Sequence, residues 1–114
     1  MLVKLSDYVA SRLFEAGVRS AFGISGGASL HLLHSIKDHP ELDIYCPHHE
    51  QAAAMAADGY ARATGGIGVT VATSGPGATN LITGICGAFY DSIPLLCLTG
   101  QVSTFRMVES TGVR

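Results

Sequence analysis

The segment that decides the fold is IGVTVATSGPGATN, residues 67–80. Residues 67–73 are apolar and β-branched, a composition typical of a strand in the middle of a sheet. A glycine-rich turn, SGPG at residues 74–77, follows directly, and a helix is predicted at residues 78–90. A strand that leads through a short turn into a helix is the repeating unit of a parallel α/β sheet.

The same alternation runs through the rest of the chain. We predict strands at residues 20–24, 43–46 and 94–100, and helices at residues 5–14, 28–38 and 50–64. Ser6 is the predicted N-cap of the first helix and Gly17 its stop. The strands are continuous apolar runs, which indicates a parallel sheet with helices on both faces. The expected fold is therefore α/β, in one domain over residues 1–114.

Composition excludes several classes of function. The formal charge is −2 and no basic run occurs, so neither nucleic acid nor an anionic membrane is an expected partner. Between Thr64 and Thr104 the only charge is Asp91, but glycines and prolines interrupt this stretch and argue against a membrane span. A sheet that is partly covered by another chain explains this nearly uncharged stretch better than a membrane span does. The first 18 residues carry charges throughout, unlike a signal peptide.

The three cysteines indicate a reducing compartment. Cys46, Cys86 and Cys97 are odd in number and lack CxxC spacing. We interpret them as reduced, buried thiols of a cytoplasmic protein.

Four polar segments follow the four predicted strands, and the carboxyl ends of parallel strands are where such folds bind ligands. They are SGG at 25–27, HHE at 48–50, TSGPGATN at 73–80 and TGQ at 99–101. The turn at 75–80 is neither a dinucleotide fingerprint, because Asn80 replaces the third glycine, nor a P-loop, because no Lys-Ser/Thr follows. An anion site and a purely structural turn remain open, with the turn favoured.

Metal binding is not expected from this chain alone. Cys46, His48, His49 and Glu50 are too closely spaced for a common set of ligands, and no HExxH pattern occurs. The sequence also contains no GxSxG elbow, so no nucleophile is predicted.

Glu50 has two interpretations. It begins an alanine-rich predicted helix, where a carboxylate satisfies free N–H groups and the helix dipole. Alternatively, an apolar pocket raises its pKa and lets it share a proton with a ligand nitrogen. Composition does not decide between the two.

Four motifs in this order resemble one family: FGISGGAS, HHEQAAAMAADGYARATG, TSGPGATNLITGI and DSIPLLCLTGQVS. The chain is similar to the N-terminal pyrimidine-binding domain of thiamine-diphosphate enzymes, which has a flavodoxin-like fold, and within them to acetolactate synthase-like carboligases. The resemblance covers nearly the whole chain. It implies decarboxylation of a 2-keto acid with ligation to a second carbonyl. A 2-keto acid decarboxylase, an oxidase, or a noncatalytic flavodoxin-like assembly module are the alternatives.

The resemblance also implies roles for individual residues. Glu50 matches the glutamate that hydrogen-bonds N1′ of the aminopyrimidine and thereby prepares the cofactor's 4′-nitrogen to take the C2 proton. Gln101 matches a glutamine near the substrate. The remaining expected cofactor-binding residues are Ser25, Gly26, Gly27, Thr73, Pro76, Gly77 and Asn80. Ser25 and Ser103 stand where family members often have proline.

Partners follow from the resemblance as well. In this family a Gly-Asp-Gly…Asn motif in another domain holds Mg²⁺ and the diphosphate, and this motif is absent here. We therefore expect the diphosphate domain of a partner subunit to complete the site, in a homodimer or homotetramer. FAD is compatible with the family but not indicated. Because the sequence ends at residues 111–114, before a typical pyrimidine domain is finished, we expect a truncated piece of a longer enzyme, inactive alone, with a separate small subunit as the alternative.

The small residues of the third helix complete the expectations. The resemblance implies that Ala53, Ala54, Ala57 and Ala61 pack closely against a second subunit and keep Glu50 dry.

Overall fold

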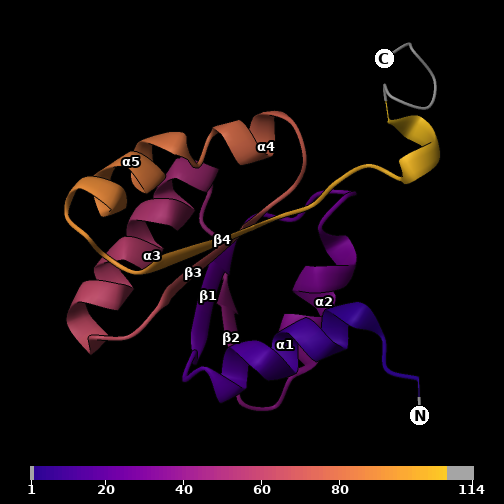
Figure 1. Ribbon diagram of the computed structural model, residues 1–114, viewed down its shortest axis with the longest axis horizontal. Helices are drawn as coiled ribbons and strands as arrows, with labels where there is room; N and C mark the ends of the chain where they lie inside the picture. The colour runs from indigo at the N-terminus through magenta and orange to yellow at the C-terminus, as the bar shows by residue number, and fades with distance from the viewer. Residues whose placement is uncertain (1, 108–114) are drawn as a thin grey trace.

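The computed structural model describes residues 2–107, so the terminal segment 111–114 lies outside the described residues. Helices and strands alternate along the chain (Figure 1). In order they are α1 (Leu5–Glu15), β1 (Ser20–Gly23), α2 (Leu30–Asp38), β2 (Asp43–Tyr45), α3 (Glu50–Thr64), β3 (Gly68–Ala72), α4 (Pro76–Thr79), α5 (Ile82–Tyr90), β4 (Leu95–Thr99) and the 3₁₀ turn η1 (Thr104–Arg106).

The four strands form one parallel sheet in the order β2-β1-β3-β4. β3 lies in the middle and all five of its residues are buried, as its apolar sequence predicts. The order is that of the first four strands of a flavodoxin-like sheet, in which the chain reverses direction across the sheet between β1 and β3. The α/β fold with a parallel sheet is therefore confirmed.

Helices cover both faces of the sheet, and each face has its own core. Val69 and Val71 of β3 point to the face covered by α1 and α2, where they pack in a cluster with Leu13, Leu33 and Ile36. On the other face, Ala72 packs with Ala54 of α3 and with Leu81. The two helical groups lie on opposite sides of the sheet in Figure 1. Because successive side chains of a strand point to opposite faces, β3 contributes side chains to both cores.

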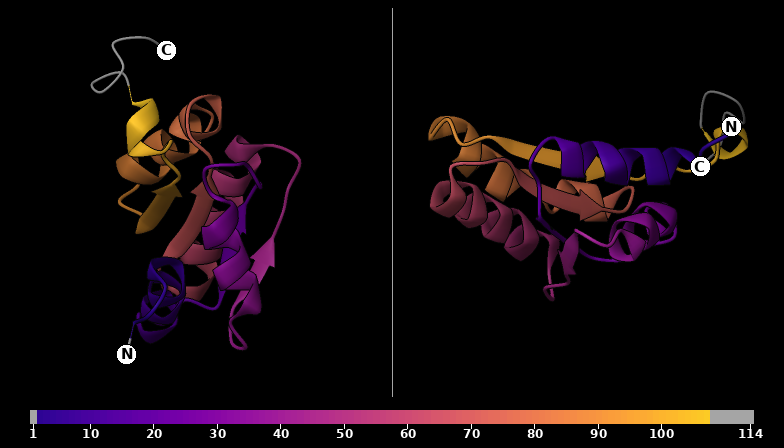
Figure 2. Two further views of the ribbon diagram at one scale, coloured as in Figure 1. Left: turned by 90° about the vertical axis from the view of Figure 1, so that its right-hand side faces the viewer. Right: turned by 90° about the horizontal axis from the view of Figure 1, so that it is seen from below.

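Small residues bring α3 close to both its neighbours. A Cβ at Gly68 would lie 2.1 Å from the carbonyl oxygen of Ala57, and one at Gly84 would lie 2.4 Å from the Cβ of Ala54. α3 and α5 accordingly lie side by side (Figures 1 and 2). The buried alanines of α3 are Ala53, Ala54, Ala57 and Ala61. They are covered by this chain's own sheet and α5, so the expectation that they contact a second subunit is wrong.

The helix predicted at residues 78–90 is interrupted. α4 ends at Thr79, Leu81 N–H donates to the carbonyl of Ala78 only three residues back, and α5 begins at Ile82. The interruption turns the Leu81 side chain, which is fully buried, into the second core. Tertiary packing overrides the local preference for one continuous helix here.

Two further expectations are corrected. α1 begins one residue before Ser6, with Lys4 as N-cap, and the Ser6 hydroxyl lies 2.8 Å from Ser35 Oγ on α2. Of the three free cysteines, Cys46 and Cys86 are exposed and Cys97 is half-buried. Cys46 follows the edge strand β2, and Cys86 lies on the outer side of α5, which explains their exposure. In the part of the chain that the structure describes, no helix is long and apolar enough to cross a membrane.

Candidate functional site

The site lies at the edge of the sheet formed by the carboxyl ends of the strands, which we call the carboxyl edge. Because all four strands are parallel, the segments that follow them meet there. The register places Ala72, at the end of β3, opposite Thr99, at the end of β4. The polar segments predicted from the sequence therefore do share one edge.

Glu50 and Asn80 form the central contact of this edge. Glu50 is the first residue of α3, and His49 before it caps the helix, its Nδ1 accepting from Gln51 N–H over 3.1 Å. Asn80 Nδ2 donates to Glu50 Oε2 over 2.9 Å. This hydrogen bond joins the segment after β2 to the segment after β3.

Thr73 packs between two of the predicted glycines. A Cβ at Gly26 would lie 2.4 Å from the Thr73 Cβ, and one at Gly77 would lie 2.7 Å from its Cγ2. Thr73 Oγ1 also accepts from Ala28 N–H over 3.3 Å. Any side chain at either glycine would push Thr73 away, so this packing requires glycine at both positions.

The electrostatics of Glu50 differ from the interpretation in which its pKa is raised. The hydrogen bond from Asn80 is the main cause that lowers the pKa of Glu50, and its own backbone N–H and the nearby His49 lower it further. Desolvation, which acts in the opposite direction, is weaker because the residue is only half-buried. In this chain by itself the pKa of Glu50 is therefore lowered, which differs from the raised pKa of the second interpretation.

An open cavity of about 410 Å³ adjoins this cluster. Its wall contains three predicted residues, Gly27, Thr73 and Gln101, and one that sequence reasoning missed, Arg106. Gln101 Oε1 accepts from Val102 N–H over 2.8 Å. Arg106 is the first charged residue after Asp91. Its position at the end of a long stretch with few charges is the feature of the sequence that could have identified Arg106.

Two predicted residues lie apart from this arrangement. Ser25 is exposed and borders a different cavity, next to Ile44 and Cys46. Pro76 is exposed at the first position of α4, where its missing N–H costs nothing. His48 is exposed as well. Within residues 2–107 no group of three or more His, Cys, Asp or Glu side chains is placed to hold a metal ion.

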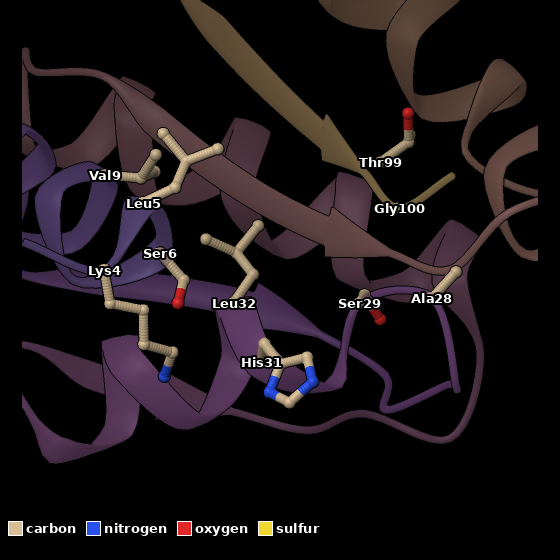
Figure 3. Close-up of a pocket in the computed structure, with 10 residues that line it drawn as sticks. All are labelled: Lys4, Leu5, Ser6, Val9, Ala28, Ser29, His31, Leu32, Thr99 and Gly100. Atoms are coloured by element: carbon tan, nitrogen blue, oxygen red, sulfur yellow. The ribbon is translucent and has the colours of Figure 1, made fainter. Parts of the chain in front are cut away.

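A larger cavity, of about 460 Å³, lies on the α1 and α2 side (Figure 3). Leu5, Val9 and Leu32 give it an apolar wall, and Thr99 and Gly100 border it at the end of β4. Neither Glu50 nor Asn80 lines it. Its polar lining residues, Lys4, Ser6, Ser29 and His31, lie apart from the predicted site residues Glu50 and Asn80.

The fold and the carboxyl edge define an α/β domain with a polar ligand site at the ends of its parallel strands. Residues 3–109 match the family model for the N-terminal TPP binding domain of thiamine pyrophosphate enzymes, and the chain belongs to this family.

The similarity of the chain to curated acetolactate synthases is consistent with its assignment to this family. The chain is 52% identical over 98 residues to the acetolactate synthase isozyme 2 large subunit of Escherichia coli, an alignment that covers 86% of this chain and 18% of the relative. It is 50% identical over 102 residues to a probable acetolactate synthase large subunit of Methanocaldococcus jannaschii, covering 90% and 17%. It is 43% identical over 99 residues to the chloroplastic acetolactate synthase 1 of Zea mays, covering 87% and 16%. The chain thus spans about a sixth of the length of these relatives.

The residues at the carboxyl edge fit the aminopyrimidine of thiamine diphosphate. Asn80 engages one oxygen of Glu50, and the other, Oε1, lies 3.4 Å from the place that a Cβ on Gly77 would occupy. Glycine at this position therefore places no side-chain atom beside Oε1. A carboxylate that is held in place by a hydrogen bond to one of its oxygens is suited to sharing a proton with a ring nitrogen.

Proposed function

We propose that this chain supplies the pyrimidine-binding half of a thiamine-diphosphate site in an acetolactate synthase-like enzyme. The enzyme would decarboxylate a 2-keto acid such as pyruvate and ligate the product to a second carbonyl. The observation that carries the proposal is the Asn80–Glu50 hydrogen bond, which fixes a carboxylate at the carboxyl edge. The similarity to acetolactate synthases supports the choice of reaction.

In this proposal each residue has a physical task. Glu50 holds a proton at N1′ of the pyrimidine through Oε1, while Asn80 keeps Oε2 in place. Gly26 and Gly77 allow Thr73 to pack closely, so that the backbone after β3 can line the ring. When bound, thiamine diphosphate supplies a nucleophilic carbon and an electron sink.

The lowered pKa of Glu50 fits this task once the site is covered. Exclusion of water by a cofactor and a partner domain disfavours a bare carboxylate, which raises its pKa from the low value of the isolated chain. Glu50 then retains a proton that it can share with N1′. The completed assembly, and not the fold of this chain alone, would therefore set the pKa of Glu50.

Gln101 borders the substrate side of the site, and Gly27 leaves room for it next to the same cavity. Ser25 and Pro76 are proposed to act through the backbone of their turns, since neither side chain lies with Glu50.

The remainder of the site belongs to other parts of the enzyme. We propose that Mg²⁺ and the diphosphate are bound by a diphosphate domain of a partner subunit, in a homodimer or homotetramer. FAD has no support from the described residues. A cytoplasmic location is proposed from the three unpaired cysteines.

Replacement of Glu50 tests the function in the complete enzyme. Glu50→Gln retains the size of the side chain and an oxygen that accepts from Asn80, but it removes the acid proton. We expect exchange of the C2 proton of bound thiamine diphosphate, followed by NMR in D₂O, to fall to the rate of the free cofactor. Glu41→Gln, at an exposed position outside the carboxyl edge, is the matched control. Near-normal exchange in Glu50→Gln would refute the role and favour a noncatalytic assembly module.

The type of reaction needs a separate measurement. Product analysis with pyruvate distinguishes ligation, which yields acetolactate, from simple decarboxylation, which yields acetaldehyde. An oxidase would instead consume an electron acceptor.

A further inference from the structure

The cavity at the carboxyl edge is polar and carries a single charge. Its wall consists of Gly27, Ala28, Thr73, Ser74, Gln101, Val102, Ser103 and Arg106. Three of these side chains are hydroxyls and one is an amide, and Arg106 is the one ionised residue among them. A neutral polar hollow with one guanidinium is suited to a small anion.

Arg106 differs from the other arginines that the structure describes. Arg12 pairs with Glu15, Arg62 pairs with Asp58 and Asp91, and Arg19 donates to main-chain carbonyls. Within residues 2–107 the Arg106 guanidinium makes neither an ion pair nor a hydrogen bond. Its recorded contact is the ring of Phe105, 5.4 Å from the guanidinium carbon. Its donors are therefore available to a ligand.

Gln101 supplies a second donor on the same wall. Because its Oε1 already accepts from Val102 N–H, the amide presents its NH₂ group to other partners. Two donor groups, one of them charged, complement the two oxygens of a carboxylate.

Thr73 connects this cavity with the Glu50 cluster. It lines the cavity and also packs against Gly77, which adjoins Glu50 Oε1. A ligand in the cavity is therefore next to the segment that would line the pyrimidine.

We propose that Arg106 and Gln101 form the subsite for the carboxylate of the 2-keto acid substrate. This inference rests on the proposed function for its substrate class, and it makes Arg106 a specificity-determining residue. The site then selects a small ketone that carries an adjacent carboxylate over the same ketone without the charge.

Binding of pyruvate to the 114-residue chain tests the subsite without any cofactor. Amide chemical shifts are followed by NMR during titration with pyruvate, with pyruvamide as the uncharged analogue and sodium chloride at equal ionic strength. We expect pyruvate, and not pyruvamide or chloride, to shift the amides of Gly27, Thr73 and Gln101. Loss of a charge-assisted pair predicts about tenfold weaker binding in Arg106→Gln.

Two further variants sharpen the result. Arg106→Lys retains the charge without the planar fork, and we expect it to recover part of the affinity. Arg12→Gln removes another exposed arginine, which does not line the cavity, and we expect no change. Equal pyruvate binding in Arg106→Gln and Arg12→Gln overturns the proposal, as does equal binding of pyruvamide or no binding of pyruvate at all. None of these outcomes affects the Glu50→Gln exchange measurement, on which the proposed function is judged separately.

Discussion

Asn80 Nδ2 lies 2.9 Å from Glu50 Oε2 and donates a hydrogen bond across 30 positions of sequence. Glu50 begins α3 after β2, and Asn80 follows the short helix α4 after β3. The two segments can meet because β2 and β3 flank β1 in one parallel sheet, so that both segments lie at the carboxyl edge. It holds the proposed proton-sharing group in a defined position.

Removal of this donor should raise the pKa of Glu50. In Asn80→Ala the main cause of the lowered pKa is lost, while desolvation remains. We expect the carboxyl carbon of Glu50, followed by NMR from neutral to acid pH, to titrate at higher pH than in the unmodified chain. Thr79→Ala, whose hydroxyl bonds to the Pro76 carbonyl and not to Glu50, should leave the pKa unchanged. An unaltered Glu50 pKa in Asn80→Ala would contradict the hydrogen bond.

We expect a second carboxylate, Asp7, to make the stability of the fold depend on pH. Buried Ser35 donates to Asp7 Oδ1 over 2.6 Å and accepts from Lys4, and this contact is the main cause that lowers the pKa of Asp7. A lowered pKa stabilises the fold at pH values above the ordinary pKa of Asp, and this stabilisation is lost as the pH falls from there through the lower pKa of the folded state.

We therefore expect Ser35→Ala to lower the urea midpoint at pH 7, and the difference from the unmodified chain to shrink in acid. Ser11→Ala, which removes an exposed hydroxyl bonded to the Asp7 carbonyl, is the control and should show no such convergence. If the difference between the two urea midpoints did not change with pH, the pKa of Asp7 would not depend on Ser35.

Two glycines of α5 should respond to alanine in opposite directions. A Cβ at Gly84 would lie 2.4 Å from the Cβ of Ala54, so Gly84→Ala should destabilise the fold by about 1–3 kcal/mol because α5 must move away from α3. Gly87 has nothing within 4 Å, so Gly87→Ala should stabilise it by about 0.5–1 kcal/mol through helix propensity. Urea unfolding of the two variants measures both, and equal effects would refute the close packing of the two helices.

Apolar residues on the outer side of α5 should make the isolated chain associate. Ile82, Phe89 and Tyr90 are exposed, Phe89 by 77%. We expect a second copy of the chain to cover this surface. Light scattering at micromolar concentration should therefore show particles larger than a monomer. Phe89→Asp should shift the population toward monomer, whereas Tyr8→Asp, on the exposed side of α1, should not. A monomer in the unmodified chain would count against a role of α5 in assembly.

Much of the architecture was already accessible from local patterns. The apolar run at 67–73 predicts a buried central strand, and β3 is buried along its whole length. The alternation of strands with helices predicts the parallel sheet, and polar segments after each strand predict the carboxyl edge. These properties depend on nearest neighbours in sequence and on the general geometry of α/β folds.

The remaining features depend on contacts between distant residues. Leu81 lies in the break between α4 and α5, and its side chain fills a core with residues of α3 and β3, which helix propensity does not reveal. The exposure of Cys46 and Cys86 and the burial of Ala53 and Ala54 follow from which side of each element meets the sheet.

The sequence by itself determined the α/β alternation, the carboxyl-edge motifs and the choice of Glu50 as the residue of interest. Only the tertiary structure decided that Asn80 binds Glu50, that its pKa is lowered in this chain, and that Arg106 shares a cavity with Gln101. The reason is physical. A strand or a helix reflects the periodicity of its own residues, whereas a hydrogen bond or a cavity exists only where the packing of the sheet brings separate segments together.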